Sequence, residues 1–489
     1  MTAELSRQAF VRGALGVAAA AVLGSCASPP AAPGSGTPTP SPSPSGSGPP
    51  RWADLGDLAV LPSDPTYGSA KTVFNTRFSG STPVAVVICR SVADVQRALA
   101  FAAANDVQVT SRSGGHSYVG ASTASGTMVL DLRRLGGPIT YDAAAATATV
   151  PAAADIDSVQ RTLSPLGRSI PTGSCPSVGL AGLALGGGLG ADARSHGLTC
   201  DAMTSATVVL PGGEVVTASA AEDADLFWAL RGGGANWGVV TSFTFTTYPT
   251  TDRDVVTLAF DGDATAEVLV GWHRWLTAAD HGVWGMVNVT VGPDPTRCSV
   301  VLATPPGAGP SLADDVVAAI GAPEISRTIR TFDRPAFVAY FGGGPDAVRP
   351  RAFVAGTDVV SQMTPVTAAA LVAATSAWPR DLVPATMVVE SLGGAIQDVA
   401  PDATAFPWRR HAASVQWYVE TPTTPLVDAA AGWLTAAHGT LGDHSAGGYV
   451  NYLEQSSPAQ RYFDSNLVRL RTLRQRYDPG RLMWSSFDW

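Results

Sequence analysis

The stretch PTGSCPSVGLAGLALGGGLG, residues 171–190, is the most unusual segment of this sequence. Seven of its twenty residues are glycine, and one cysteine, Cys175, precedes six of them. Glycine costs conformational entropy, so this density indicates a backbone that closely approaches a flat or anionic group, with peptide N–H groups directed at phosphate. The apolar residues between the glycines favour a buried, ligand-facing strand or loop over a flexible linker: Val178, Leu180, Leu183, Leu185 and Leu189.

A second glycine-rich loop lies upstream in TSRSGGHSYVG, residues 110–120, where Gly114 and Gly115 precede His116. Neither loop matches a common nucleotide motif. The Gly186–Gly188 run is too loose to open a helix as GxGxxG does, and no Lys-Ser/Thr pair follows it as a Walker loop requires. The sequence therefore contains two glycine-rich loops, each with one reactive side chain.

These two loops together resemble those of the berberine-bridge-enzyme-like flavoproteins, members of the vanillyl-alcohol-oxidase group with a PCMH-type FAD-binding domain. In that family, the histidine of R-S-G-G-H and the cysteine of C-x-x-V-G-x-x-G both bond to the isoalloxazine ring of one FAD. The resemblance implies covalent attachment of FAD here through His116, at the 8α carbon, and through Cys175, at ring carbon C6.

The residues around the loops alternate between strand and helix signals. An apolar run at 83–88 precedes a capping box at Ser91–Asp94, and a strand at 107–110 leads into the His116 loop. That loop thus follows the carboxyl end of a strand, where open α/β sheets commonly bind ligands. Further elements are expected as strands at 128–132, 147–150, 206–210, 214–217 and 241–247, a hairpin at 211–213, a helix at 225–230 and a third glycine-rich loop at 231–240.

Residues 251–445 have a different character, with alternating strands separated by alanine-rich helical windows. Strands are expected at 255–260, 283–291, 298–303 and 414–419. Mixed elements of this kind predict an α+β domain with an antiparallel sheet, which the resemblance places over the flavin. Its aromatic residues Trp408, Trp417 and Tyr418 either line a substrate groove or pack in the core.

The tail contains Tyr449-Val450-Asn451-Tyr452, then Ser457-Pro458 as a helix start, then apolar residues at helical spacing up to Tyr477. This resembles the family's closing Y-x-N-Y strand and long helix, which pack back on the FAD domain. On a strand, Tyr449 and Asn451 would face one way and Tyr452 the other.

The sequence therefore predicts an α+β fold in three parts. A two-subdomain PCMH-type FAD-binding domain is expected over 51–250, a substrate domain over 251–445, and a berberine-bridge-like C-terminal segment over 446–489.

Residues 1–26 read as an export segment, with an apolar run at 14–24 that is too short to span a bilayer. Leu23-Gly24-Ser25-Cys26 resembles a lipobox, and an ordinary cleaved signal with a chance cysteine is the alternative. Ser6–Val11 resembles a twin-arginine signal whose second arginine is replaced by Gln8. Residues 27–50 contain only Pro, Ser, Gly, Thr and Ala and read as a tether. We expect an exported protein whose membrane contact is a lipid at Cys26.

The composition describes a globular chain with a large core, since 45% of residues are hydrophobic and 15% charged. A net charge of −9 disfavours nucleic acid and anionic membrane surfaces as partners. The five cysteines have no regular spacing and imply neither a disulfide framework nor a metal cluster, so Cys89 and Cys200 are expected to be buried. No metal site is predicted, and His196 is either a core or surface histidine or a contact to substrate or flavin.

The resemblance also implies candidate catalytic residues. Oxidising family members use the first tyrosine of Y-x-N-Y as a base, which implies Tyr449. A free phenol has a pKa near ~10, so activity at neutral pH requires roughly 4 kcal/mol of stabilisation of its anion. Tyr452, Gln416 and Glu390 are the candidate sources. Gln416 stands where some relatives carry a glutamate base, which favours simple alcohol oxidation over ring closure. A purely structural role is the alternative for Tyr449 and Glu390.

Val178 stands three residues after Cys175, where relatives with valine leave space for dioxygen beside the flavin, so it favours an oxidase; an ordinary core residue is the alternative. The cofactor-binding positions that the resemblance implies are His116, Cys175, Arg112, Ser113, Gly114, Gly115, Ser117, Gly120, Val178, Gly179, Gly182, Leu183, Gly186, Gly187, Gly188, Gly238, Val240 and Asn451.

The sequence thus predicts an FAD-dependent oxidase that converts a hydroxyl group of a sugar, oligosaccharide or hydroxylated secondary metabolite to a carbonyl or lactone, with O2 reduced to H2O2. Two alternatives share the scaffold: an FAD-linked dehydrogenase with a non-oxygen acceptor, and a tethered binding protein without turnover.

Overall fold

The computed structural model describes residues 50–343 and 348–489. The predicted export segment lies outside the described residues, as does the tether apart from Pro50. Within the described part of the chain, no helix combines the length and apolar composition that a membrane crossing requires.

The first sheet holds the strand that leads to the His116 loop. Its order is β1-β2-β4-β3, and β2, β4 and β3 run parallel. Its strands are β1 (Ala59–Val60), β2 (Ala85–Ile88), β3 (Val109–Arg112) and β4 (Met128–Asp131). Helix α2 (Val92–Ala104) begins at the predicted capping box of Ser91 and Asp94. Because β3 ends at Arg112, the glycines and His116 follow its carboxyl end, as predicted.

The second sheet is antiparallel, with the order β5-β6-β10-β8-β9. Its strands are β5 (Thr140–Asp142), β6 (Thr147–Pro151), β8 (Met203–Val209), β9 (Val215–Ser219) and β10 (Val239–Thr246). The predicted hairpin joins β8 to β9. The shorter elements around the two sheets are α1 (Tyr67–Ala70), α3 (Ile156–Leu163), β7 (Arg168–Ser169), α4 (Leu180–Leu185), α5 (Ala193–His196), α6 (Ala224–Leu230) and β11 (Tyr248–Pro249).

The stretch 171–190 differs from its prediction as a strand or loop, because its middle forms helix α4. Gly179 caps this helix, and the buried residues are Leu180, Ala181, Ala184 and Leu185. Burial at positions i, i+1, i+4 and i+5 follows a helical period. The sequence did not predict this helix, because the glycines on both sides leave only six residues in which a helical period could be recognised.

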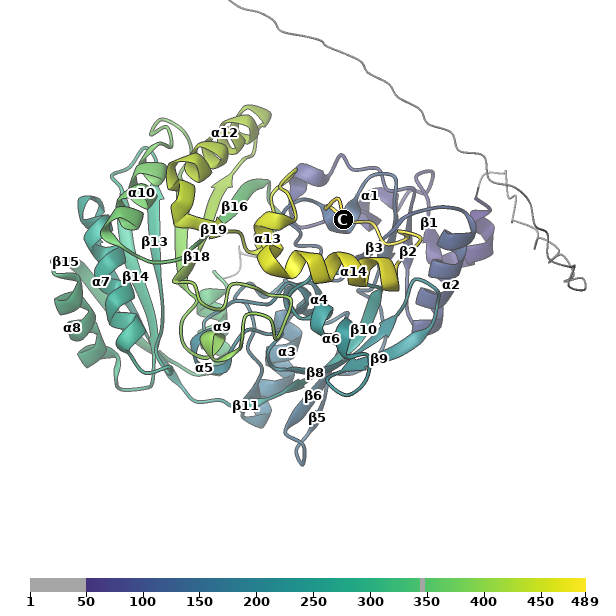
Figure 1. Cartoon of the computed structure of the whole chain (residues 1–489), viewed down its shortest axis with the longest axis horizontal. Helices are drawn as coiled ribbons and strands as arrows, with labels where there is room; N and C mark the ends of the chain where they lie inside the picture. The colour runs from purple at the N-terminus through teal and green to yellow at the C-terminus, as the bar shows by residue number, and fades with distance from the viewer. Residues whose placement is uncertain (1–49, 344–347) are drawn as a thin grey trace, which may run out of the picture. The chain divides into compact units, whose positions relative to one another are not determined.

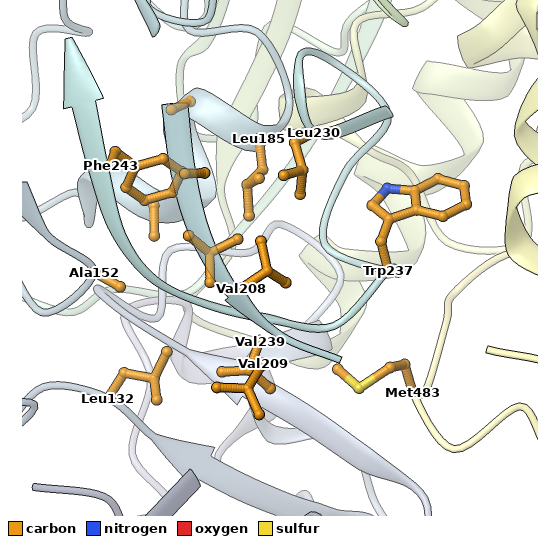
Figure 2. Close-up of a cluster of buried hydrophobic side chains, with 14 of the residues drawn as sticks. Leu132, Ala152, Leu185, Val208, Val209, Leu230, Trp237, Val239, Phe243 and Met483 are labelled. Atoms are coloured by element: carbon orange, nitrogen blue, oxygen red, sulfur yellow. The ribbon is translucent and has the colours of Figure 1, made fainter. Parts of the chain in front are cut away.

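One hydrophobic cluster joins the two sheets to the C-terminal tail (Figure 2). Val208 and Val209 of β8 and Val239 of β10 contribute to it, and Met483 enters from the tail. Helix α14 (Leu467–Tyr477) also contacts α6. The tail therefore packs back on these two sheets, as the resemblance implied.

The third sheet is antiparallel, with the order β15-β12-β14-β13-β17-β18-β16-β19. Its strands are β12 (Arg253–Asp261), β13 (Trp284–Val291), β14 (Arg297–Thr304), β15 (Glu324–Phe332), β16 (Phe353–Val360), β17 (Ala385–Ser391), β18 (Ala413–Glu420) and β19 (Ser445–Gly447). Four helices cover one face, on the left in Figure 1: α7 (Thr265–Ala278), α8 (Gly309–Ile320), α10 (Pro365–Ser376) and α12 (Thr424–Leu441). Two more helices are α9 (Arg334–Phe341) and α11 (Ala395–Asp398). The predicted α+β fold with an antiparallel sheet is confirmed.

Alternation along β18 separates the two faces of this sheet. Val415, Trp417 and Val419 belong to the core under the helices. Gln416 and Tyr418 therefore point from the opposite face. That face, free of the four helices, is the one that contributes to the candidate site.

The tail corrects two predictions. Tyr449–Tyr452 is not a strand, because Val450–Tyr452 forms a 3₁₀ turn. Residues three apart share a side of such a turn, so the rings of Tyr449 and Tyr452 meet, with centroids 5.0 Å apart. The expected long helix is also interrupted. It divides into α13 (Gln460–Phe463) and α14, because Asp464 between them adopts a φ of 42°.

Candidate active site

A cavity of about 380 Å³ lies where the glycine-rich loops, the tail and the third sheet meet. Its lining includes both predicted loops, the third glycine-rich loop and residues 483–487 of the tail. The third sheet contributes Phe353 and Tyr418. Segments from the first half of the chain and from the tail therefore converge on one space, with two residues from the third sheet.

Most of the predicted cofactor positions line this cavity: Ser113, Gly114, Gly115, His116, Ser117, Cys175, Val178, Gly179, Gly182, Leu183, Gly186, Gly238, Val240 and Asn451. Four predicted positions do not line it: Arg112, Gly120, Gly187 and Gly188. Arg112 is fully buried, and its Nη2 atom lies 2.8 Å from Oδ2 of Asp131. Burial lowers the pKa of the Arg112 guanidinium, and Asp131 opposes that change. Arg112 thus supports the loop from beneath and does not line the cavity.

The two reactive loops touch through their backbones. A Cβ atom added to Gly114 would lie 2.2 Å from the amide nitrogen of Gly179, and one added to Gly179 would lie 2.2 Å from the nitrogen of Gly114. No side chain fits between them. The glycine at each position is therefore required for the loops to approach, and this approach brings His116 and Cys175 to one wall.

Ser177 lies between the two reactive side chains. Its Oγ atom is 3.0 Å from Nε2 of His116 and 3.7 Å from Sγ of Cys175. The ring of Phe74 stacks on His116 with centroids 3.9 Å apart. Desolvation lowers the pKa of His116 to about 4, so its imidazole is neutral near pH 7. Ser177 and Phe74 were not predicted, although Ser177 stands within the cysteine motif itself.

Cys175 differs from the other described cysteines. Cys89, Cys200 and Cys298 are buried, whereas Cys175 is partly exposed at the cavity. Burial raises the pKa of the Cys89 thiol to about 12. The expectation that Cys89 and Cys200 are buried is confirmed, and the reactive thiol of this site is Cys175.

Tyr452 lines the cavity and pairs with Glu390, which does not itself line it. The Tyr452 hydroxyl donates to Oε2 of Glu390 over 3.2 Å. Glu390 is 8% exposed, and burial raises its pKa to about 7, although the bond from Tyr452 opposes the change. Desolvation likewise raises the pKa of Tyr452 well above its usual range. The pair holds one carboxyl group that can take up a proton near neutral pH.

Tyr118 joins this pair to Gln416. Its ring stacks on Tyr452 with centroids 5.4 Å apart, and its hydroxyl accepts a hydrogen bond of 2.5 Å from Nε2 of Gln416. Tyr118 was not predicted as a site residue. Its place two residues after His116, within the same loop, is the signal that could have found it.

Tyr449, the predicted base, does not line the cavity, although its hydroxyl is bonded to Asn451, which does. Tyr449 is 2% exposed and packs in a separate apolar cluster with residues such as Leu198 and Phe406. Its hydroxyl oxygen accepts from the backbone N–H groups of Gly188 (2.9 Å) and Leu189 (3.2 Å) and from Nδ2 of Asn451 (2.8 Å). Burial raises the pKa of Tyr449 despite these donors. In this structure, Tyr449 fixes the backbone at Gly188 and Leu189 through these hydrogen bonds.

A row of aromatic rings extends from Tyr118 to two residues of the third sheet, Phe353 and Tyr418. Phe353 lies 5.1 Å from Tyr118 and 5.2 Å from Tyr418, measured between ring centroids. Of the three aromatic residues predicted for a groove, only Tyr418 lines the cavity. Trp408 and Trp417 are buried in the core. His196 stacks on Tyr248 with centroids 3.7 Å apart, is exposed and is not a cavity residue, which favours its interpretation as a surface histidine.

Comparisons with known proteins agree with this architecture. A family model described as an FAD binding domain matches residues 83–219, and one described as berberine and berberine like matches residues 448–486. An uncharacterized FAD-linked oxidoreductase of Bacillus subtilis is 30% identical over 436 residues, which cover 86% of this chain and 94% of the relative. The chain belongs to the berberine-bridge-enzyme-like family. It is an FAD-linked oxidoreductase.

Two further relatives carry more specific names. A xylooligosaccharide oxidase of Thermothelomyces thermophilus is 30% identical over 450 residues, covering 84% of this chain and 88% of the relative. The solved structure of the Acremonium strictum glucooligosaccharide oxidase, described with a 6-S-cysteinyl, 8α-N1-histidyl FAD, has a TM-score of 0.80 at 23% identity and covers 88% of this chain and 97% of its own. That likeness concerns the fold.

The cavity fits the FAD that this family binds. On its reactive wall, Gly114 and Gly179 pack backbone against backbone, and Gly182 lines open space, since a Cβ atom added there would have nothing within 4 Å. Gly186 is restricted like Gly114 and Gly179, since an added Cβ atom would lie 2.0 Å from Oδ1 of Asn451. Such a wall admits a large flat group, and its peptide N–H groups are available to phosphate.

Proposed function

We propose that this protein is an oxidase whose FAD is bonded to both His116 and Cys175. It oxidises a hydroxyl group of a sugar, an oligosaccharide or a hydroxylated secondary metabolite to a carbonyl or lactone, and O2 is reduced to H2O2. The observation that carries the proposal is that His116 and Cys175 flank Ser177 in the same cavity that Tyr452 lines, with the Tyr452 hydroxyl bonded to Glu390.

The residues that would hold the cofactor are those of the reactive wall and the tail. His116 and Cys175 would provide the covalent bonds, and the glycines from 114 to 186 the contact surface. When bound, FAD supplies an acceptor for the two electrons that leave the substrate carbon.

Tyr452 with Glu390 is the proposed base, in place of Tyr449. An ionised Glu390 accepts the hydrogen bond of the Tyr452 hydroxyl. Tyr452 can therefore take the proton of a substrate hydroxyl as it transfers its own proton to Glu390. This relay requires no free phenolate, which agrees with the raised pKa of Tyr452 and with a Glu390 pKa of about 7.

Three neighbours would orient the substrate: Tyr118, Phe353 and Tyr418. Because Gln416 donates to the Tyr118 oxygen, the Tyr118 hydroxyl can direct its own hydrogen at the substrate oxygen. Phe353 and Tyr418 offer flat apolar faces on which a sugar or an aromatic ring can stack. The relatives named for oligosaccharides support the sugar class.

The proposal favours oxygen as the acceptor because Val178, a small residue, lines the cavity beside Gly179. A dehydrogenase that uses another acceptor is the alternative. The two are separated by the yield of peroxide per oxygen consumed.

The experiment has two stages. Intact mass and the visible spectrum of denatured protein first test covalent FAD, with the His116→Ala and Cys175→Ala double variant as the control that must release its pigment. A panel of oligosaccharides and aromatic alcohols is then read out as peroxide. Wild-type protein that loses its pigment on denaturation contradicts bicovalent attachment. Dye reduction without peroxide supports the dehydrogenase.

Export and lipid attachment at Cys26 remain proposals from the sequence. A labelled fatty acid incorporated in wild-type protein and absent from Cys26→Ser would support them.

A further inference from the structure

A second cluster of charged groups lies on the opposite face of the third sheet. Thr357 pairs with Gln416 across β16 and β18 and shares the face of the cavity. The next residue, Asp358, therefore points to the face under α12. Its side chain is fully buried. A buried carboxylate is retained only when it is well paired, so the surroundings of Asp358 are informative.

Asp358 has donors from four elements. Oδ2 accepts from Nε1 of Trp417 on β18 and contacts Nδ1 of His438 on α12, both at 2.8 Å. Oδ1 accepts from Ser445 of β19 at 2.6 Å and from Nη2 of Arg461 on α13 at 2.9 Å. Asp358 thus ties strands, helix α12 and the tail together.

His438 contacts a second carboxylate with its other nitrogen. Nε2 lies 2.8 Å from Oε2 of Glu454, and Oε1 of Glu454 accepts from the amide nitrogen of Thr357 over 2.9 Å. A neutral imidazole carries one N–H, whereas an imidazolium carries two and can donate to both carboxylates. A protonated His438 can therefore donate to Asp358 and to Glu454 at the same time.

Glu454 connects this cluster to the cavity, because it stands two residues after Tyr452. Its position is narrowly fixed. A Cβ atom added to Gly356 would lie 2.7 Å from Cδ of Glu454, and the amide nitrogen of Glu454 donates to the Tyr462 hydroxyl over 3.0 Å. Any movement of Glu454 would shift the tail segment that presents Tyr452 to Glu390.

We infer that His438 is a positioning residue: held as an imidazolium between Asp358 and Glu454, it fixes the tail segment that places Tyr452 against Glu390, and its deprotonation sets the alkaline limit of activity. This inference rests on the proposed function, in which Tyr452 takes the substrate proton.

The charges around His438 support this behaviour. Asp358 and Glu454 face it from β16 and the tail, and Arg461 faces it from α13, with Nη2 3.1 Å from Nδ1 of His438. Burial alone would lower the pKa of His438, but the two carboxylates outweigh burial and raise it to about 9. With His438 charged, two cations balance two carboxylates. Deprotonation leaves an uncompensated negative charge.

The sign of the pH effect follows from this raised pKa. The stabilisation is fully present below the ordinary histidine pKa of 6.5 and is lost as pH rises through about 9. Loss of the contact between His438 and Glu454 allows Glu454 to move, together with the tail segment that contains Tyr452. We therefore expect both thermal stability and kcat/KM to fall together at that pH.

The test compares wild-type holoenzyme with His438→Gln and with His281→Gln, an exposed control. Each is measured for kcat/KM and for melting temperature from neutral pH upward. In His438→Gln, kcat/KM at neutral pH should fall between about ten- and a hundredfold, as expected for a small displacement of the reacting group. Its alkaline decline at about pH 9 should disappear from both measurements. The control should follow wild type.

A second variant keeps the inference testable if His438→Gln does not fold. Glu454→Gln retains the shape and removes one of the two carboxylates, so the pKa of His438 falls and the alkaline decline should move about one pH unit lower. Profiles of both variants that coincide with wild type overturn the inference and leave the proposed function intact. A wild-type protein that oxidises no substrate overturns the proposed function, and the melting temperatures still report whether His438 carries its charge.

Discussion

The cavity has two walls of different construction. The reactive wall is made of backbone, where Gly114, Gly179 and Gly186 leave no space for side chains. The substrate wall is made of side chains, contributed by Tyr118, Phe353, Tyr418 and Tyr452 from separate parts of the chain. On the reactive wall, a single added methyl group would force the backbones apart. On the substrate wall, each aromatic side chain can be replaced without displacing the others. The first should determine whether cofactor binds and the second which substrate is used.

The largest effect is expected from Gly179→Ala. The added Cβ atom would lie 2.2 Å from the backbone of Gly114, so the two loops must separate and FAD binding should be abolished. The measurement is flavin per protein in the purified sample. Gly68→Ala is the matched control, because nothing lies within 4 Å of its added Cβ atom. A Gly179→Ala protein with full flavin would show that the loops can move apart without consequence.

The next effect is expected at the proton relay. Glu390→Gln removes the group that receives the proton, and its kcat should fall by about 10²–10⁴-fold. Tyr452→Phe should lower kcat by a similar factor. In wild type, activity should decline as pH falls through about 7, because Glu390 must be ionised to accept. Flavin content should stay unchanged. A fall of the same size in Tyr449→Phe, with flavin retained, would instead favour the first tyrosine.

A smaller effect is expected from Val178→Leu, which adds one methylene at the cavity without touching the relay. Reoxidation by oxygen should slow by about tenfold, and reduction of an artificial dye should stay the same. Stopped-flow measurement of the two half-reactions separates them. Equal slowing of both would assign Val178 to packing alone.

The smallest effect is expected on the substrate wall. Phe353→Leu removes one stacking face, worth about 0.5–1.5 kcal/mol, so KM should rise between about two- and twelvefold with kcat nearly constant. Tyr418→Phe, which keeps its ring, is the control and should change KM less. A change in flavin content in either variant would contradict the assignment of cofactor binding to the reactive wall alone.

The same division explains what the sequence could reveal. The reactive wall is encoded by contiguous motifs, so the loops of His116 and Cys175 and most of their glycines could be placed in advance. Phe353 and Phe74 carry no local signal. Phe353 reaches the cavity from β16 of the third sheet, and Phe74 through backbone hydrogen bonds to Gly115 and Arg351. The sequence assigned the base to Tyr449, whereas we propose Tyr452. The orientation of the two side chains could not be predicted, because a 3₁₀ turn replaces the expected strand and alternation does not apply to Tyr449 and Tyr452.

Elsewhere the errors arise where glycine or a positive φ interrupts a pattern. Six helical residues between glycines, Leu180–Leu185, are too few for their period to be recognised. Asp464 divides a predicted helix that its apolar spacing alone would continue. In the third sheet, the sequence predicted β12, β13, β14 and β18, and burial alternates along β13 and β18. It missed β15, β16, β17 and β19, since β16 is buried along its whole length and β19 has only three residues.

The tail has a consequence for the order of events during synthesis. Residues 483–487 line the cavity, and the backbone nitrogen of Trp484 donates to the carbonyl of Val109 in the strand that leads to His116. A ribosome that has made both glycine-rich loops has not yet made this part of the enclosure. The cavity is therefore complete only after these tail residues have been made, and the proposed attachment of FAD is expected to follow their synthesis.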